Sequence, residues 1–284
     1  DLIVSISKVT HEIVSEAAPE VANIYHPHAV DPAIFKPVSQ EEIDSMREKN
    51  LQGNKDKVVF FWNNRNARRK QSGSLIFWFK KFLDDVGHDK AQLIMHTDPK
   101  DPHGQDLNHI VERLRLNTQR QVLFSTQKVG QQDLSALYNM VDCTINISDA
   151  EGFGLATLES MSCGTPIIAN MTGGLQEQVV LGSDATGIAL IPESKAIIGS
   201  QDVPYIYEDR LSEAQVVDAL KKMYALGKEG RKEMGLKGRE HVMKNYNFET
   251  FNKQWVDIMT EIHEEEGSWD TRTNYHGIRF LEVA

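Results

Sequence analysis

The residues with the clearest capacity for chemistry lie in one stretch, Asn146 to Ala169, which reads NISDAEGFGLATLESMSCGTPIIA. The pattern predicts a strand ending near Ile147, a loop that contains Gly152 and Gly154, and a helix beginning at about Gly154. Glycine lets the backbone approach a ligand closely. The N–H groups of a first helical turn have no partner within the helix, and the helix dipole favours an anion beside them. The loop therefore predicts a phosphate site.

Two carboxylates accompany this loop. Glu151 lies within it, and Glu159 follows eight positions later in the predicted helix. A carboxylate can accept two hydrogen bonds, so each of the two could hold a vicinal diol. The alternative is a solvated loop acid at Glu151 and a surface helix acid at Glu159. The Gly-Phe-Gly sequence between them, directly after a strand, favours the ligand-binding interpretation.

A cationic cluster follows another apolar strand and comprises Arg65, Arg68, Arg69 and Lys70. Arginine suits bidentate contact with phosphate, and lysine supplies a point charge. One interpretation is a solvated cationic loop, and the other is an anion site. The position directly after a strand, in a chain of net charge -10, favours the anion site.

The elements that must position these residues are short apolar strands that alternate with helical stretches. The predicted strands are residues 2–6, 58–62, 92–95, 122–124, 141–147 and 166–169. The predicted helices are residues 41–50, 72–86, 107–114, 134–138, 155–161, 211–226 (with Ser212 as N-cap), 230–246 and 249–266. This alternation predicts an α/β fold: a Rossmann-like parallel sheet with helices on both faces. Residues 187–209 are predicted to be less regular, and the tail from Gly267, with Trp269, Tyr275 and Phe280, is assigned no structure.

Composition excludes several classes of function. The 284 residues are 40% hydrophobic and 25% charged, which is ordinary for a globular protein. A net charge of -10 argues against nucleic-acid binding. No apolar run approaches the roughly 20 residues of a transmembrane helix. The sequence has no Asp-x-Asp pair and no histidine cluster with ligand spacing. Cys143 and Cys163 lie in apolar stretches, which is typical of a reduced, cytosolic protein.

The segment EGFGLATLESMSCGTPIIA resembles the E-x7-E signature of retaining glycosyltransferases of family 4, the glycosyltransferase group 1 proteins with the GT-B fold. Phe60 to Gln71 (FFWNNRNARRKQ) is similar to the family's strand followed by G-R-L-x-x-x-K-G, with Arg65 and Lys70 on its Arg and Lys; Asn64 and Gln71 replace its glycines. Three further stretches are similar to family segments: DLSALYNMVDCTINIS, TGGLQEQV and the linker HPHAVDPAIFKP.

The resemblance implies a nucleoside diphosphate sugar as donor, with no metal or other cofactor. Its diphosphate would contact Arg65, Lys70 and the amides of Gly152, Phe153, Gly154 and Leu155. Donors aimed at the leaving diphosphate stabilise the charge that builds there. By the same resemblance, Glu151, the catalytic candidate, contacts the hydroxyls of the transferred sugar, and Glu159 contacts the ribose hydroxyls. The acceptor, whether a glycan, a lipid or a protein glycan, stays open, and retention of the anomeric configuration is implied by the family alone.

The resemblance also implies a division of the chain. Residues 1–38 are interpreted as the end of an N-terminal domain and the linker, 39–248 as the donor-binding domain, and 249–284 as a crossover helix and tail. The rest of the N-terminal domain, which in the family supplies most of the acceptor site, is expected to precede this chain. The expected location is cytoplasmic or peripheral at a membrane surface. Two alternatives remain: a non-catalytic sugar-nucleotide binding module or truncated transferase, and a sugar-nucleotide 2-epimerase.

Overall fold

The computed structural model describes residues 2–51, 53–268 and 270–271. Its main part is a six-stranded sheet with the order β5-β4-β3-β6-β7-β8, in which every neighbouring pair is parallel. The strands are β3 (Val58–Asn63), β4 (Ala91–His96), β5 (Val122–Ser125), β6 (Cys143–Asn146), β7 (Ile167–Asn170) and β8 (Gly187–Leu190). The predicted α/β fold with a Rossmann-like parallel sheet is therefore confirmed.

Strand β3 shows why the sheet is buried on both faces. Successive side chains of a strand point to opposite faces. Phe60 and Trp62 belong to one hydrophobic cluster, while Val59 and Phe61 belong to the other, and all four are fully buried. A continuous apolar run of this kind is typical of a parallel strand that is covered by helices on both sides.

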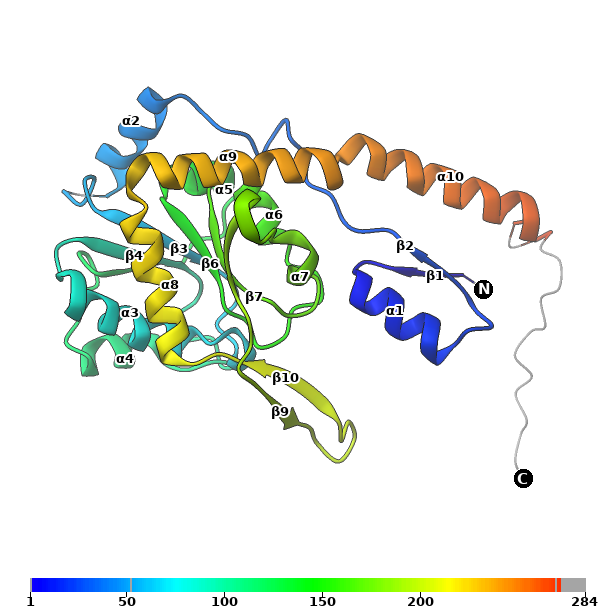
Figure 1. Cartoon of the computed structure of the whole chain (residues 1–284), viewed down its shortest axis with the longest axis horizontal. Helices are drawn as coiled ribbons and strands as arrows, with labels where there is room; N and C mark the ends of the chain where they lie inside the picture. Colours follow the sequence, from blue (N-terminus) through cyan, green and yellow to red (C-terminus); the bar gives the residue numbers. More distant parts are fainter. Residues whose placement is uncertain (1, 52, 269, 272–284) are drawn as a thin grey trace.

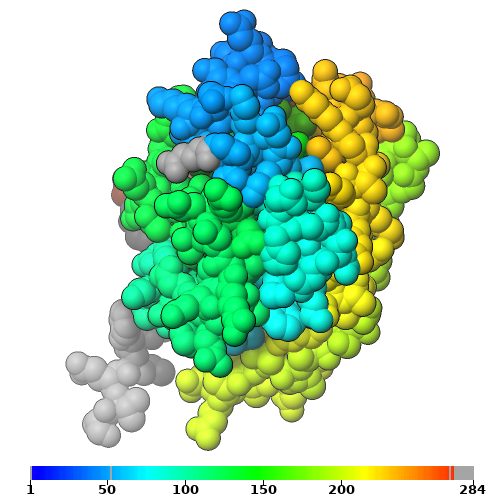
Figure 2. All heavy atoms as spheres, turned by 90° about the vertical axis from the view of Figure 1, so that its left-hand side faces the viewer, coloured from blue at the N-terminus to red at the C-terminus, as the bar shows by residue number. Residues whose placement is uncertain are grey.

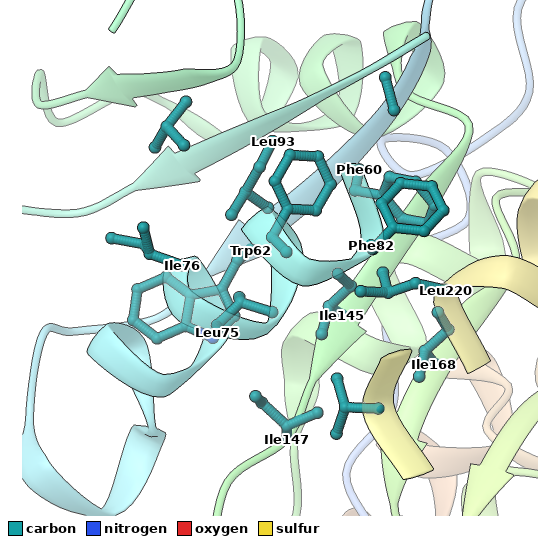
Figure 3. Packing of buried hydrophobic residues seen from close by; sticks show 14 of the residues in the cluster. Phe60, Trp62, Leu75, Ile76, Phe82, Leu93, Ile145, Ile147, Ile168 and Leu220 are labelled. Carbon is teal, nitrogen blue, oxygen red and sulfur yellow. The ribbon is translucent and has the colours of Figure 1, made fainter. Parts of the chain in front are cut away.

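Helices cover the two faces as separate layers. On one face, α3 (Ser72–Val86), α4 (Leu107–Arg113) and α8 (Glu213–Ala225) contribute to the cluster around Phe60 and Trp62. Figure 3 shows Phe82 of α3 and Leu220 of α8 in the cluster that contains Phe60 of β3. Figure 2 shows α3 beside α8 on the surface. The other cluster includes buried side chains of α5 (Gln131–Met140), α6 (Leu155–Ser162) and α9 (Gly227–Asn245), together with Leu175.

The remaining helices of this part are α2 (Gln40–Asn50) and α7 (Leu175–Gln178), together with two 3-10 turns at Arg68–Lys70 and Gly182–Asp184. The predicted N-cap of α8 is confirmed, because the Ser212 side chain accepts a hydrogen bond from the Gln215 amide.

The prediction of a less regular stretch at residues 187–209 is wrong. This stretch contains β8 and an antiparallel hairpin of β9 (Ser194–Ile198) and β10 (Ile206–Arg210). The hairpin projects from the body below the sheet (Figure 1). Its side chains are mostly exposed, with Tyr205 at 75% and Tyr207 at 61%, so the core that guides a sequence-based prediction contributes little here.

The N-terminal segment forms a small β-α-β unit: β1 (Leu2–Ser5), α1 (Lys8–Ala17) and β2 (Ala22–Tyr25), with the two strands parallel. The second strand was not predicted. The final helix, α10 (Phe248–Glu266), runs away from α9 and passes the linker that follows β2 (Figure 1). The contacts between the linker and α10 include His26, which stacks on Phe251 at 4.7 Å and has its Nδ1 3.0 Å from Gln254 Oε1. Trp269, Tyr275 and Phe280 of the tail lie outside the described residues.

Candidate functional site

The candidate site lies where the order of the sheet reverses. β3 and β6 are neighbours and parallel, with Phe60 opposite Cys143, so both strands end at the same edge. β4 and β5 continue the sheet on one side, and β7 and β8 continue it on the other. In open α/β sheets, ligands bind beyond the carboxyl ends of the strands at this kind of switch point. The loops after β3 and β6 carry the predicted site residues except Leu155 and Glu159, which lie on α6.

A buried ion pair joins these two loops. Lys70, at the end of the 3-10 turn after β3, pairs through Nζ with Glu151 Oε2 from the loop after β6. Their side chains are only 9% and 14% exposed, and Ser148 Oγ donates a second hydrogen bond to Glu151 Oε2 at 3.3 Å. Burial lowers the pKa of Lys70 although Glu151 acts in the opposite direction. A buried ammonium of this kind favours an additional anion.

The glycine loop leads into α6 as the sequence predicts. Gly154 has a φ of 94°, a left-handed conformation that glycine adopts freely, and the helix begins at the next residue. Among the described residues, no side chain caps this helix. Leu155 is 44% exposed. Phe153 is buried, with its ring 5.1 Å from His28 and 6.1 Å from Tyr246. Its contribution to a ligand would therefore come from its amide and not from its ring.

Two further glycines, Gly173 and Gly174, lie directly before α7 and pack against the backbone of this loop. A Cβ atom on Gly173 would lie 1.7 Å from the carbonyl oxygen of Glu151, and one on Gly174 would lie 2.7 Å from the Cα of Phe153. Real Cβ atoms do not approach backbone so closely, so the Gly-Gly turn ahead of α7 allows the two backbones to touch. Gly174 N–H donates to the Glu151 carbonyl at 3.3 Å.

Glu159 has a hydrogen-bonded environment of its own on α6. Tyr138 of α5 donates from its hydroxyl to Glu159 Oε2 at 2.8 Å, and Asn63, the last residue of β3, donates to the same hydroxyl at 2.9 Å. Burial raises the pKa of Glu159, and the hydrogen bond from Tyr138 opposes this shift. The acid is therefore held in one orientation and is not the freely solvated surface acid of the alternative interpretation.

Arg65 lies apart from this pair. Its Nε donates to Asp101 Oδ2 at 2.6 Å, and its Nη2 lies 2.7 Å from His103 Nδ1. Asp101 and His103 belong to the segment after β4, and the Arg65 side chain is 60% exposed. The structure thus brings Lys70, Glu151 and the 152–155 loop together, whereas Arg65 is engaged in a separate surface ion pair.

Several residues around the site were not predicted from the sequence. Tyr138 lies on another helix, 21 positions before Glu159, and no spacing rule connects the two. Asp149 is 2% exposed and bonds to Gln71 and Arg210. The sequence does show a second acid two positions before Glu151, but the partners of Asp149 are known only from the tertiary structure.

No group of three or more His, Cys, Asp or Glu side chains is arranged to hold a metal ion in the part of the chain that the structure describes. No helix within the described ranges is long and apolar enough to cross a membrane.

Comparison with known proteins gives the family. A family model described as glycosyl transferases group 1 matches residues 42–232, which is more than half of the chain. The chain belongs to the glycosyl transferases group 1 family. The matched region contains both site loops, and the structural neighbours of the chain include glycosyltransferases of the GT-B fold.

Individual relatives of this group 1 chain are distant. N-acetyl-alpha-D-glucosaminyl L-malate synthase of Bacillus anthracis is 26% identical over 195 residues, which cover 65% of this chain and 46% of the relative. Sucrose-phosphate synthase from Thermosynechococcus elongatus superposes with a TM-score of 0.72 at 21% identity, covering 93% of this chain and 59% of the other. HepE from Anabaena, solved with UDP and glucose, gives a TM-score of 0.70 at 17% identity, covering 91% and 62%. The chain spans 46% of the length of the Bacillus anthracis synthase, the curated relative named above.

Proposed function

We propose that this chain is the donor-binding part of a glycosyltransferase that moves a hexose from a nucleoside diphosphate sugar to an acceptor hydroxyl. The single observation that supports this most directly is the buried Lys70–Glu151 pair beside the glycine loop, at the carboxyl ends of β3 and β6. A cation and uncapped helical N–H groups at one sheet edge suit a diphosphate.

In this proposal, Lys70 and the amides of residues 152–155 hold the diphosphate. Lys70 is paired with Glu151 in the free protein, so the phosphate would take the place of that carboxylate on the ammonium. Glu151 would then be free to accept hydrogen bonds from the transferred sugar. As the bond between sugar and diphosphate breaks, negative charge grows on the leaving group, and donors already aimed at it stabilise that state.

Glu159 is proposed to hold the ribose hydroxyls. Tyr138 occupies Oε2, and within the described residues Oε1 has no hydrogen-bond partner. The tyrosine would orient the carboxylate so that its other oxygen faces the ribose. Arg65 would have to leave Asp101 to reach a phosphate, so we propose Lys70 as the principal side-chain contact and Arg65 as a peripheral one.

Several finer features are proposed from the resemblance. The E-x7-E spacing of Glu151 and Glu159 supports membership of family 4 and transfer with retention. Because cationic and amide donors are available for the diphosphate, we propose that no metal is needed. HepE, the neighbour solved with UDP and glucose, supports UDP as the first nucleotide to test. An N-terminal domain is proposed to complete the acceptor site.

Isothermal titration calorimetry with UDP, GDP and ADP, each with and without EDTA, tests the binding step. We expect one nucleotide to bind, with an affinity that EDTA does not change and that Lys70→Met weakens. Absence of binding to all three would contradict the donor-site assignment, and binding that EDTA abolishes would contradict metal independence. Transfer is then assayed with the N-terminal domain present, and NMR of the product reads its anomer. Binding without transfer in that assay would instead favour the non-catalytic module, and an inverted product would exclude family 4.

A further inference from the structure

The base of the β9–β10 hairpin contacts the loop that carries Lys70. Both terminal nitrogens of Arg68 donate to the Glu208 carboxylate of β10, at 2.8 and 2.7 Å. Arg210, two residues along β10, donates to Glu208 Oε2 at 3.0 Å and pairs with Asp149 on the other site loop. Glu208 is 4% exposed and Asp149 is 2% exposed, so both carboxylates are removed from water.

Asp149 is the point at which three segments meet. Its side chain accepts from Gln71 Nε2 at 2.6 Å, in addition to its pair with Arg210. Its backbone N–H donates to the Arg69 carbonyl at 2.7 Å, and its own carbonyl accepts from the Asp209 N–H at 2.8 Å. The residues on either side of Lys70 are therefore both tied to Asp149, which itself lies two positions before Glu151.

The charges in this cluster balance: the carboxylates of Asp149 and Glu208 face the guanidinium groups of Arg68 and Arg210. The two carboxylates are buried, while the side chains of Arg68 and Arg210 are 55% and 27% exposed. Removing one charge of a pair whose carboxylate is buried is costly because it leaves an uncompensated charge, whereas removing a matched pair costs much less. Burial already raises the pKa of Asp149, and Arg210 opposes that shift. Without Arg210, Asp149 keeps only the amide of Gln71 as a side-chain partner, and the junction of the two loops weakens.

We propose that Arg210 and Asp149 are positioning residues that lock the Lys70 loop to the Glu151 loop, so that the hairpin forms a structural support of the donor site. This inference rests on the proposed function for its relevance to the donor, but the junction can be measured in the free protein. The hairpin tip, including the 75% exposed Tyr205, takes no part in these contacts.

The test is the rate at which trace acetic anhydride acetylates Lys70 in the ligand-free protein, measured by mass spectrometry. Lys57 is the internal reference, because it precedes β3 at the opposite edge of the sheet and its Nζ donates to the Arg120 carbonyl at 2.7 Å. The variants are Arg210→Gln, Asp149→Asn and the double variant, with Tyr205→Ala as the matched hairpin control. UDP affinity is measured on the same set.

We expect each single substitution to raise the Lys70 to Lys57 labelling ratio and the Kd for UDP by about tenfold, as in coupled networks. The double variant, which removes a matched pair, should return both to within about threefold of wild type. An unchanged ratio, or equal acceleration of both lysines, would overturn the inference, since the second result reports general loss of stability. If the wild-type protein binds no nucleotide, the donor proposal fails, while the labelling ratio still decides whether the junction exists.

Discussion

Replacing Lys70 by methionine separates the contribution of this side chain to stability from its contribution to binding. Methionine keeps the length and apolar stem of the side chain but removes the ammonium. In the free protein the change leaves Glu151 without its cation, since the remaining side-chain bond to that carboxylate is the 3.3 Å contact from Ser148. In the complex it removes the group that we propose to hold the diphosphate.

The magnitude follows from the burial of the pair. Removing one partner of a buried ion pair costs about 3–5 kcal/mol. Glu151 is 14% exposed and keeps some contact with water. We therefore expect Lys70→Met to lower the free energy of unfolding by about 3 kcal/mol, the lower end of this range. The double variant Lys70→Met/Glu151→Gln removes both charges. Burial outweighs Glu151 in its effect on the Lys70 pKa, so we expect this variant to lie within about 1 kcal/mol of wild type.

The assay is urea unfolding followed by circular dichroism, with calorimetric titration of UDP on the same proteins. Both variants should lose UDP affinity, although only the single variant loses stability. A double variant as unstable as the single one would show that the ion pair itself stabilises the fold and that the reasoning from desolvation is incorrect. Full UDP affinity in either variant would remove Lys70 from the donor site.

Two further substitutions test the loop and the second acid. Gly173→Ala places a Cβ 1.7 Å from the Glu151 carbonyl oxygen at a φ of 49°, and we expect it to lower the free energy of unfolding in urea by roughly 3 kcal/mol. The control Gly182→Ala has a φ of 85° and no atom within 4 Å of the new Cβ, so its expected loss is about 1–2 kcal/mol. Equal losses in the two variants would contradict the packing argument. Burial raises the pKa of Glu159 in the folded protein, so folding favours its protonated form, and stability should fall as the pH rises from about 4.5 through the folded pKa. Glu159→Gln should flatten that fall and weaken UDP binding by about 1–3 kcal/mol, and an unchanged pH profile or affinity would contradict its role.

Much of the sheet and its helices could be predicted because burial leaves a periodic record in the sequence. The helix Ser72–Val86 was predicted with its observed bounds, since Leu75, Ile76, Phe79, Phe82 and Leu83 recur at helical spacing and are all fully buried. The apolar runs of β3 and β6 likewise predicted where their following loops begin. Because the structure pairs these two strands, the two loops lie together and form one candidate site.

The hairpin could not be predicted in this way because its strands, β9 and β10, face mainly solvent and show no apolar alternation. The partners of the site residues were also inaccessible. Arg65 and Lys70 are five positions apart in the sequence, and yet one pairs with Asp101 and the other with Glu151. Which carboxylate a cation meets depends on where other strands end, and that is decided by the tertiary structure.

The adjacency of β3 and β6 has a consequence for how the site forms. Lys70 and Glu151 are 81 residues apart, and the segment between them includes β4 and β5. Closing a loop of this length costs conformational entropy that no short-range contact repays. No locally folded fragment of the chain contains the assembled pair. A nucleotide that binds this pair as proposed would act on the native state alone and would prolong its lifetime by slowing unfolding, while the rate of folding would stay as it is.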